Sequence, residues 1–108
     1  MPLDTLLTFT PAFFGSVAVP VGAAKLVELA DLEVGESQED TSDKVLLTNL
    51  GPGHVLAIIS GDNSVQAGPE NGVPVLAGHS LALAYVDDGF LSLWAVADRA
   101  VVNVAIGV

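Results

Sequence analysis

The sequence predicts an all-β fold, and three observations carry that prediction. The 11 glycines and 6 prolines divide the chain into short apolar segments, and segments of about 5–8 residues have the length of strands rather than helices. Several segments alternate large apolar residues with small or polar ones, which is the two-residue period of a strand. With 108 residues, the chain can build one hydrophobic core. We therefore expect a single antiparallel β-sandwich, jelly-roll-like, with an extended N-terminal segment.

Residues 1–16 are expected to form an N-terminal arm or a first strand, and residues 17–108 the sandwich domain. The first segment is rich in large apolar side chains around Pro11. An arm would pack on a neighbouring subunit or on a larger assembly, whereas a first strand would belong to the same domain, and the sequence leaves both open. The candidate assembly interface consists of Leu6, Leu7, Phe9, Phe13, Phe14 and, from a later strand, Trp94.

The next segments predict their structure less clearly. Residues 17–21 are apolar and include Pro20, which is typical of an edge strand because proline lacks a backbone donor. Residues 23–34 contain good helix formers, so local propensity favours a helix there. The β character of the rest of the chain favours a strand over residues 25–29 instead, and we adopt the strand.

A long polar loop is predicted between residues 28 and 43, which hold 7 of the 13 acidic residues. Such a charged stretch is typical of a solvated connection. Because loops also carry binding residues, cation binding or docking on a basic partner by residues 36–43 is the alternative.

The second half of the chain shows the strand pattern best. Residues 44–50 and 54–60 are nearly continuous in apolar character, as core strands of a sandwich are, and Gly51-Pro52-Gly53 connects them. Residues 81–85 and 91–97 alternate on either side of the turn signal Asp88-Gly89, which predicts a hairpin. In the last strand, Val102, Val104 and Ile106 form one face and the residues between them form the other.

The composition predicts association. Hydrophobic residues make up 51% of the chain and charged residues only 15%, against a usual charged share of about 25%. A chain of this length buries only about 60–70% of its unfolded surface, so a monomer of this composition would expose apolar patches. Such patches usually mark interfaces, and we expect a homo-oligomer.

The charge balance argues against several partners. The formal net charge is −10, and the basic residues are only Lys25, Lys44 and Arg99. Binding to nucleic acid or to an anionic membrane surface needs basic clusters, so we expect neither. No apolar run approaches the roughly 18 residues that span a bilayer, and the N-terminus lacks the basic start of a secretory signal. We expect a mature intracellular product.

The sequence contains few groups that could carry chemistry. There is no cysteine, and His54 and His79 lie in separate glycine-flanked turns without the spacing of a paired metal site. Asp87-Asp88-Gly89 and Gly61-Asp62-Asn63-Ser64 are typical of turns. Neither a nucleophile elbow nor a phosphate-binding glycine-rich loop is present. We expect no enzymatic activity, no cofactor and no metal.

Several short strings carry a resemblance to a known family. They are VLLTNLG at residues 45–51, the apolar residues 55–59, GDNSV at residues 61–65 and GVPVLAGHSL at residues 72–81. Over residues 17–108, this succession resembles small β-sandwich proteins of tailed-bacteriophage virions. The acidic stretch at residues 36–43 departs from the family pattern, where a tighter connection is expected.

The resemblance implies a structural subunit that decorates or cements the capsid, or forms a head fibre or spike. Its partners would be its own copies, in a homotrimer, and the major capsid protein or other virion proteins. Made in the host cytoplasm, it would lie on the capsid exterior, where its carboxylates avoid the packaged genome. There are two alternatives. One is a tail or baseplate adaptor, and the other is a jelly-roll module that binds carbohydrate or a receptor through Trp94.

Overall fold

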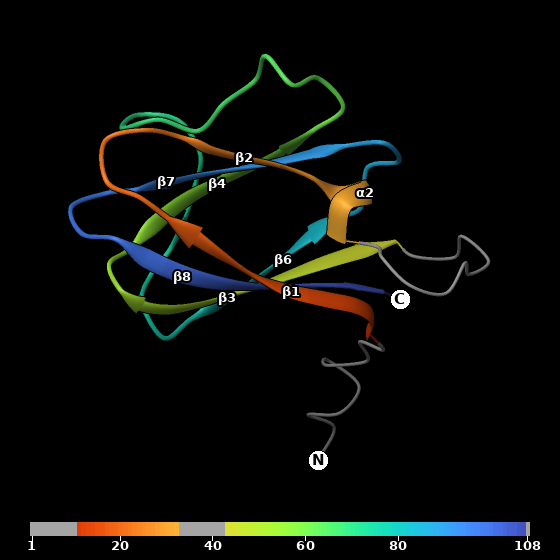
Figure 1. The fold of residues 1–108 in the computed structure, drawn as a ribbon, viewed down its shortest axis with the longest axis horizontal. Coiled ribbons are helices and arrows are strands. Elements are labelled where there is room, and N and C mark those ends of the chain that lie inside the picture. Colours follow the sequence, from red (N-terminus) through yellow and green to blue (C-terminus); the bar gives the residue numbers. More distant parts are fainter. Residues whose placement is uncertain (1–10, 33–42, 108) are drawn as a thin grey trace.

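The computed structural model describes residues 11–32 and 43–107, which form two four-stranded antiparallel sheets packed face to face (Figure 1). Within these residues, no helix is long and apolar enough to cross a membrane. A single helical turn, α2 (Leu29–Leu32), follows the second strand. The strands are β1 (Pro11–Val19), β2 (Lys25–Glu28), β3 (Lys44–Pro52), β4 (Val55–Ser60), β5 (Val73–Val75), β6 (Ser80–Ala84), β7 (Phe90–Ala95) and β8 (Ala100–Gly107).

The strand order is that of a jelly roll. Sheet A has the order β1-β8-β3-β6 and sheet B the order β2-β7-β4-β5. The antiparallel pairs β1–β8, β2–β7, β3–β6 and β4–β5 have numbers that sum to nine, as they do when one long antiparallel ribbon winds around itself. The predicted all-β, jelly-roll-like sandwich is therefore confirmed.

The core lies between the sheets and is built from alternate residues of the long strands. Each strand turns every second side chain inward, and β8 follows the predicted pattern from Ala100 to Ile106, with its even-numbered residues buried and its odd-numbered ones outward. The one-turn helix adds Leu29, which is fully buried and whose N–H donates to Gly89 O at 3.0 Å. The largest core side chains are Leu29, Leu47, Leu91, Leu93, Ile106, Val19, Val45, Val55, Val75, Val102 and Val104.

Two predictions for the first half of the chain are confirmed in part. Residues 17–19 belong to an edge strand, β1 of sheet A, but that strand begins at Pro11 and ends at Val19, so Pro20 and Val21 lie outside it. Residues 25–28 form a strand, not the helix that their propensity favours, because pairing with β7 lets Val27 pack against the core. The helix formers that follow give only one helical turn.

The predicted hairpin around Asp88-Gly89 is wrong. β6 pairs with β3 in sheet A, whereas β7 pairs with β2 and β4 in sheet B. The turn, closed by the Gly89 N–H that donates to Val86 O at 2.9 Å, therefore connects the two sheets. Alternation predicts a strand with one buried face, but both sheets bury a face in the same core, so the pattern does not identify the partner. The second strand also ends at Ala95, before the predicted residue 97.

The nearly continuous apolar run of β3 is not buried on both faces. Its residues alternate between buried and partly exposed, and Leu50 is 57% exposed. A two-layer sandwich covers only one face of each sheet, so the outward apolar residues of β3 stay accessible. The expected domain boundary between residues 16 and 17 falls inside β1, so residues 11–16 begin the first strand. Residues 1–10 and 33–42, with Leu6, Leu7, Phe9 and most of the acidic loop, lie outside the described residues.

Candidate functional site

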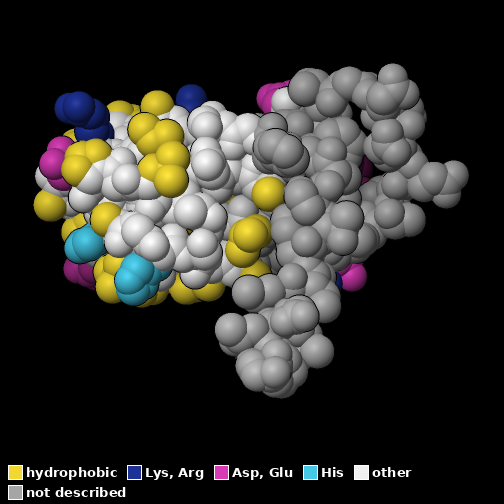
Figure 2. Space-filling view, turned by 90° about the horizontal axis from the view of Figure 1, so that it is seen from below, with side chains coloured by type: hydrophobic (Ala, Val, Ile, Leu, Met, Phe, Trp, Pro, Cys, Tyr) yellow, Lys and Arg dark blue, Asp and Glu magenta, His cyan; other side chains and the backbone are white. Residues whose placement is uncertain are grey.

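Among the described residues, the outer face of sheet A carries no charged side chain between its two ends. We call it the neutral face. Figure 2 looks onto it and shows uncharged side chains across its middle, with charged side chains at its ends. The strand registers place a row of Ser16, Asn103, Thr48 and Ser80 across all four strands. The neutral face consists of Ser16, Ala18, Leu46, Thr48, Leu50, Ser80, Ala82, Ala84, Val101, Asn103 and Ala105.

Polar groups on the neutral face hydrogen-bond to one another. Ser16 Oγ donates to Asn103 Oδ1 at 2.7 Å, and the hydroxyls of Thr48 and Ser80 lie 3.0 Å apart. The other side chains are alanine, valine or leucine, so the surface is weakly polar. Such a surface costs little to desolvate when a partner covers it, because few of its groups need new hydrogen bonds.

The loops β1–β2, β3–β4, β5–β6 and β7–β8 meet at one end of the sandwich, which we call the loop end. Backbone bonds join them: Gly53 N–H donates to Arg99 O at 3.0 Å, and Val96 N–H donates to His54 O at 2.9 Å. The loop end gathers five of the seven exposed large apolar side chains that the structure describes: Val21 (55%), Leu50 (57%), Leu76 (45%), Val96 (53%) and Val101 (38%).

A buried asparagine holds the loop end together. Asn49 is fully buried at an inward position of β3. Its Nδ2 donates to Gly53 O at 2.9 Å and to Val75 O at 2.8 Å, and its Oδ1 accepts from Gly51 N–H at 2.8 Å. The side chain thus joins sheet A to β5 of sheet B. We did not identify this role from the sequence, although an amide in the apolar run VLLTNLG was a signal for it.

The two ends of the sandwich differ in charge. The loop end carries Lys25 and Arg99, with both histidines and a single described carboxylate, Asp98. At the opposite end, which we call the acidic end, the described carboxylates lie at the end of β2, within α2, just before β3, or between β6 and β7. They are Glu28, Asp31, Asp43, Asp87 and Asp88. The third basic residue, Lys44, lies at this end and pairs with Asp43 at 3.6 Å.

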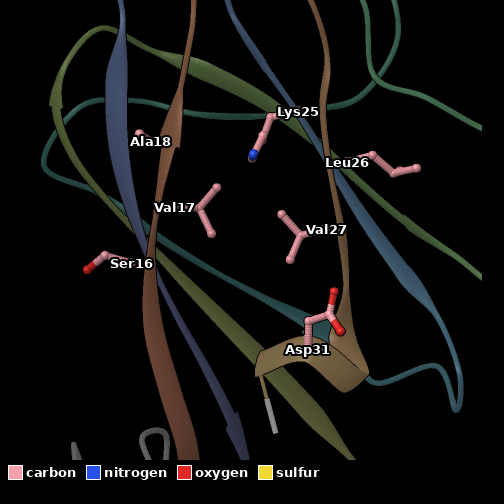
Figure 3. A pocket seen from close by; sticks show the side chains of 7 residues that line it. All are labelled: Ser16, Val17, Ala18, Lys25, Leu26, Val27 and Asp31. Carbon is pink, nitrogen blue, oxygen red and sulfur yellow. The ribbon is translucent and has the colours of Figure 1, made fainter. Parts of the chain in front are cut away.

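Two adjoining hollows run along β1 and β2, where the sandwich is open at its side. The first, of about 330 Å³, lies between the two strands; Figure 3 shows Val17 and Val27 facing each other across it, with Lys25 pointing inward. The second, of about 460 Å³, lies at the loop end and shares Lys25 with the first. We call it the cation pocket; it is lined by Ala18, Val19, Pro20, Lys25, Arg99, Ala100 and Val101.

Both cations of this pocket lack a counter-ion in the described part of the chain. The ion pair between Lys44 and Asp43 is the only one among residues 11–32 and 43–107, so Lys25 and Arg99 form none there. In a chain of net charge −10, two of the three basic side chains therefore line one largely apolar hollow. Such a hollow can bind an anionic group that carries apolar neighbours.

The two histidines occupy the loop end as turn residues. His54 Nδ1 accepts a hydrogen bond from Ala77 N–H at 2.9 Å, and the main chain of His79 bonds to Asn49 and Leu76. Within residues 11–32 and 43–107, no group of three or more His, Asp or Glu side chains is arranged to hold a metal ion.

The acidic turn at Asp62 is a local structure. Asp62 Oδ1 accepts from Ser64 N–H at 2.9 Å and from Ser64 Oγ at 2.8 Å. These bonds, the backbone one first, favour the ionised carboxylate and lower the pKa of Asp62 below its ordinary value. The group is exposed, and the arrangement is a turn stabilised by a short acidic side chain.

The remaining candidate interface residues are separated. Phe13 and Phe14 lie on β1, paired with Ile106 and Ala105 of β8. Trp94 lies on β7, half-buried on the outer face of sheet B and opposite Leu56 of β4. These residues therefore come from opposite sheets, so within the described part of the chain the structure does not bring Trp94 together with the N-terminal segment.

Comparison with known proteins adds no relative: no family model matches the chain, and neither a curated protein nor a solved structure is significantly similar to it.

Proposed function

We propose that this chain is a non-enzymatic structural subunit of a tailed-bacteriophage virion, a capsid decoration or cement protein or a head-fibre subunit. It binds the capsid surface and its own copies. The family resemblance of residues 17–108 suggests this role, and the jelly roll is an architecture that viral capsid proteins use. Because one fold serves many functions, we infer the role from the surfaces as well as from the fold.

The neutral face carries the proposal. In a chain with 13 acidic residues and a charge of −10, none of the carboxylates that the structure describes lies on this sheet face. Eight residues of β8 extend about 26 Å, and four strands span about 19 Å, giving about 500 Å². A standard interface buries about 800 Å² on each partner, so this face supplies more than half of one. We assign it to the capsid surface.

Two alternatives have less support. Carbohydrate binding needs an accessible aromatic platform, and Trp94 is half-buried beside Leu56. A tail or baseplate adaptor would use the same kind of neutral surface, so only its position in the particle distinguishes it from a decoration protein.

The proposal is tested on phage particles from the genome that encodes the chain. Mass spectrometry of purified particles should detect the protein, and gold-labelled antibody should mark the head. Label on the tail would favour the adaptor, and particles that lack the protein would overturn the virion role.

A second test addresses the neutral face directly. The variant Ala82→Glu places a carboxylate on this face, midway along its edge strand β6, and we expect the binding to undecorated shells in co-sedimentation to fall at least tenfold. The matched control, Gln66→Glu, adds the same charge to the exposed β4–β5 loop and should bind as the wild type does. Equal binding by both variants would move the capsid contact elsewhere.

A further inference from the structure

We propose that the cation pocket receives Asp4 of a second copy, together with the apolar residues around it. The inference rests on the self-association included in the proposed function and names its site. One copy thereby inserts its N-terminal segment into the loop end of the next.

The pocket determines the chemistry of its occupant. Lys25 and Arg99 offer two positive charges with no acidic partner in the described residues, and valine, proline and alanine supply the rest of the lining. A volume of about 460 Å³ is within the usual range for ligand pockets, about 300–1,000 Å³. The pocket therefore suits a single carboxylate between apolar side chains, not a densely charged polyanion.

The N-terminal segment has this chemistry. Asp4 is the only charged side chain before Lys25, and its neighbours in the sequence include Leu3, Leu6 and Leu7. The exposed apolar residues of the loop end, such as Val21 and Val101, offer these leucines a surface to cover. The acidic run at residues 36–43 offers carboxylates but no large apolar neighbour.

Asp4 of the same copy would reach the pocket only if its segment reversed direction at Pro11 and were almost fully extended. The chain enters the sandwich at Pro11, which pairs with Gly107 at the acidic end. From Pro11 to Val19 is about 26 Å along the strand. The seven residues from Asp4 to Pro11 span at most about 25 Å when fully extended, and the chain would also have to reverse direction. A second copy, whose N-terminal segment arrives from outside, meets no such limit.

The resulting contact joins unlike surfaces. The loop end of one copy meets the N-terminal segment of the next, which leaves its own sandwich at the acidic end. Such a head-to-tail contact closes into a ring when its rotation permits, and a three-membered ring is compatible with the expected homotrimer. The contact covers the neutral face only at its loop end, at Ala18 and Val101, and leaves the rest of that face available to the capsid.

The experiment is a charge exchange on the full chain, read as native mass by light scattering over a range of concentrations. We expect the wild type to associate and both Asp4→Lys and the double variant Lys25→Glu, Arg99→Glu to lose at least tenfold in association constant. An equimolar mixture of the two variants should regain mass above that of either alone, because the ammonium introduced at position 4 then meets the carboxylates introduced at positions 25 and 99.

Two controls change charge elsewhere. Glu70→Lys reverses an exposed charge in the β4–β5 loop, and Lys44→Glu reverses the one basic residue outside the pocket. Both should keep the wild-type mass, and circular dichroism verifies that every variant is folded. A monomeric wild type, unchanged mass in the two charge variants, or a mixture that fails to recover would each overturn the assignment. Shell binding, measured separately, tests the virion role.

Discussion

The outer faces of the two sheets carry different kinds of side chain. Sheet B turns large apolar side chains outward, among them Leu56 and Trp94. The β4–β5 loop passes over the outer side of this sheet (Figure 1). Ala67 of this loop is 3% exposed, and its N–H donates to Ser92 Oγ at 2.8 Å, where Ser92 is 1% exposed. Sheet A turns small and weakly polar side chains outward, and within the described residues no loop crosses it.

This difference separates a face that is covered within the chain from a face that is open to a partner. Where the loop approaches sheet B, a Cβ on Gly72 would lie only 3.0 Å from Leu56 Cβ, so the contact is close. The outer face of sheet B is thus part of the folding unit, and substitutions there should act on stability. Substitutions on the neutral face should act on binding.

The sharpest test inserts the same charge into both faces. Ser92→Glu buries a carboxylate beneath Ala67 with no basic partner, and we expect a loss of at least about 3 kcal/mol in the free energy of unfolding. Ala82→Glu, on the exposed neutral face, should change it by less than about 0.5 kcal/mol. Urea unfolding followed by circular dichroism measures both. Equal destabilisation would contradict the distinction between the faces.

The next effect concerns the asparagine that joins the two sheets. Asn49→Ala leaves Gly53 O, Val75 O and Gly51 N–H without their buried partner. We expect a loss of about 3 kcal/mol, since each unsatisfied buried group costs about 1–3 kcal/mol and water can reach part of the turn. Thr48→Ala, one residue away on the outer face, is the control and should lose under about 1 kcal/mol. A loss of the same size in both would mean that Asn49 does not hold the loop end.

A smaller effect compares single hydrogen bonds on the two faces. Ser92→Ala removes the acceptor of the buried Ala67 N–H and should cost about 1–2 kcal/mol. Asn103→Ala removes the acceptor of Ser16 Oγ on the neutral face, where water replaces it, and should cost under about 0.5 kcal/mol. Hydrogen exchange at the Ala67 amide should accelerate only in Ser92→Ala. Unchanged protection would show that the loop is held by other contacts.

The sequence predicted the strands better than their arrangement. Alternation in residues 101–106 and the turn residues around Gly51 predicted strands, because burial of one face imposes a two-residue period. The same alternation could not show that β6 and β7 belong to different sheets, since pairing depends on distant residues. It also could not predict the neutral face, which appears only when registers bring Ser16, Thr48 and Asn103 side by side.

The sequence could not predict the cation pocket, for the same reason. Lys25 and Arg99 are separated by most of the chain, and the jelly-roll winding places β2 and the start of β8 at the same end. The sequence did show that basic residues are few, and its excess of apolar side chains predicted self-association. The fold brings two of these scarce basic residues, Lys25 and Arg99, together with apolar side chains in one hollow.

The smallest expected effect lies in the β4–β5 loop that covers sheet B. The pKa of Asp62 is lowered by the hydrogen bonds from Ser64, so the folded state favours the ionised form. Its contribution to stability is present above the ordinary aspartate pKa of about 3.9 and is lost as the pH falls through the lowered value. An NMR titration should place the Asp62 pKa below the ordinary aspartate value, and Ser64→Ala, which removes the hydroxyl but keeps the backbone N–H, should bring it part of the way back. Because the carboxylate is exposed, the stability curve should change little. An Asp62 pKa that is the same in Ser64→Ala and in the wild type would show that the Ser64 hydroxyl does not contribute to the shift.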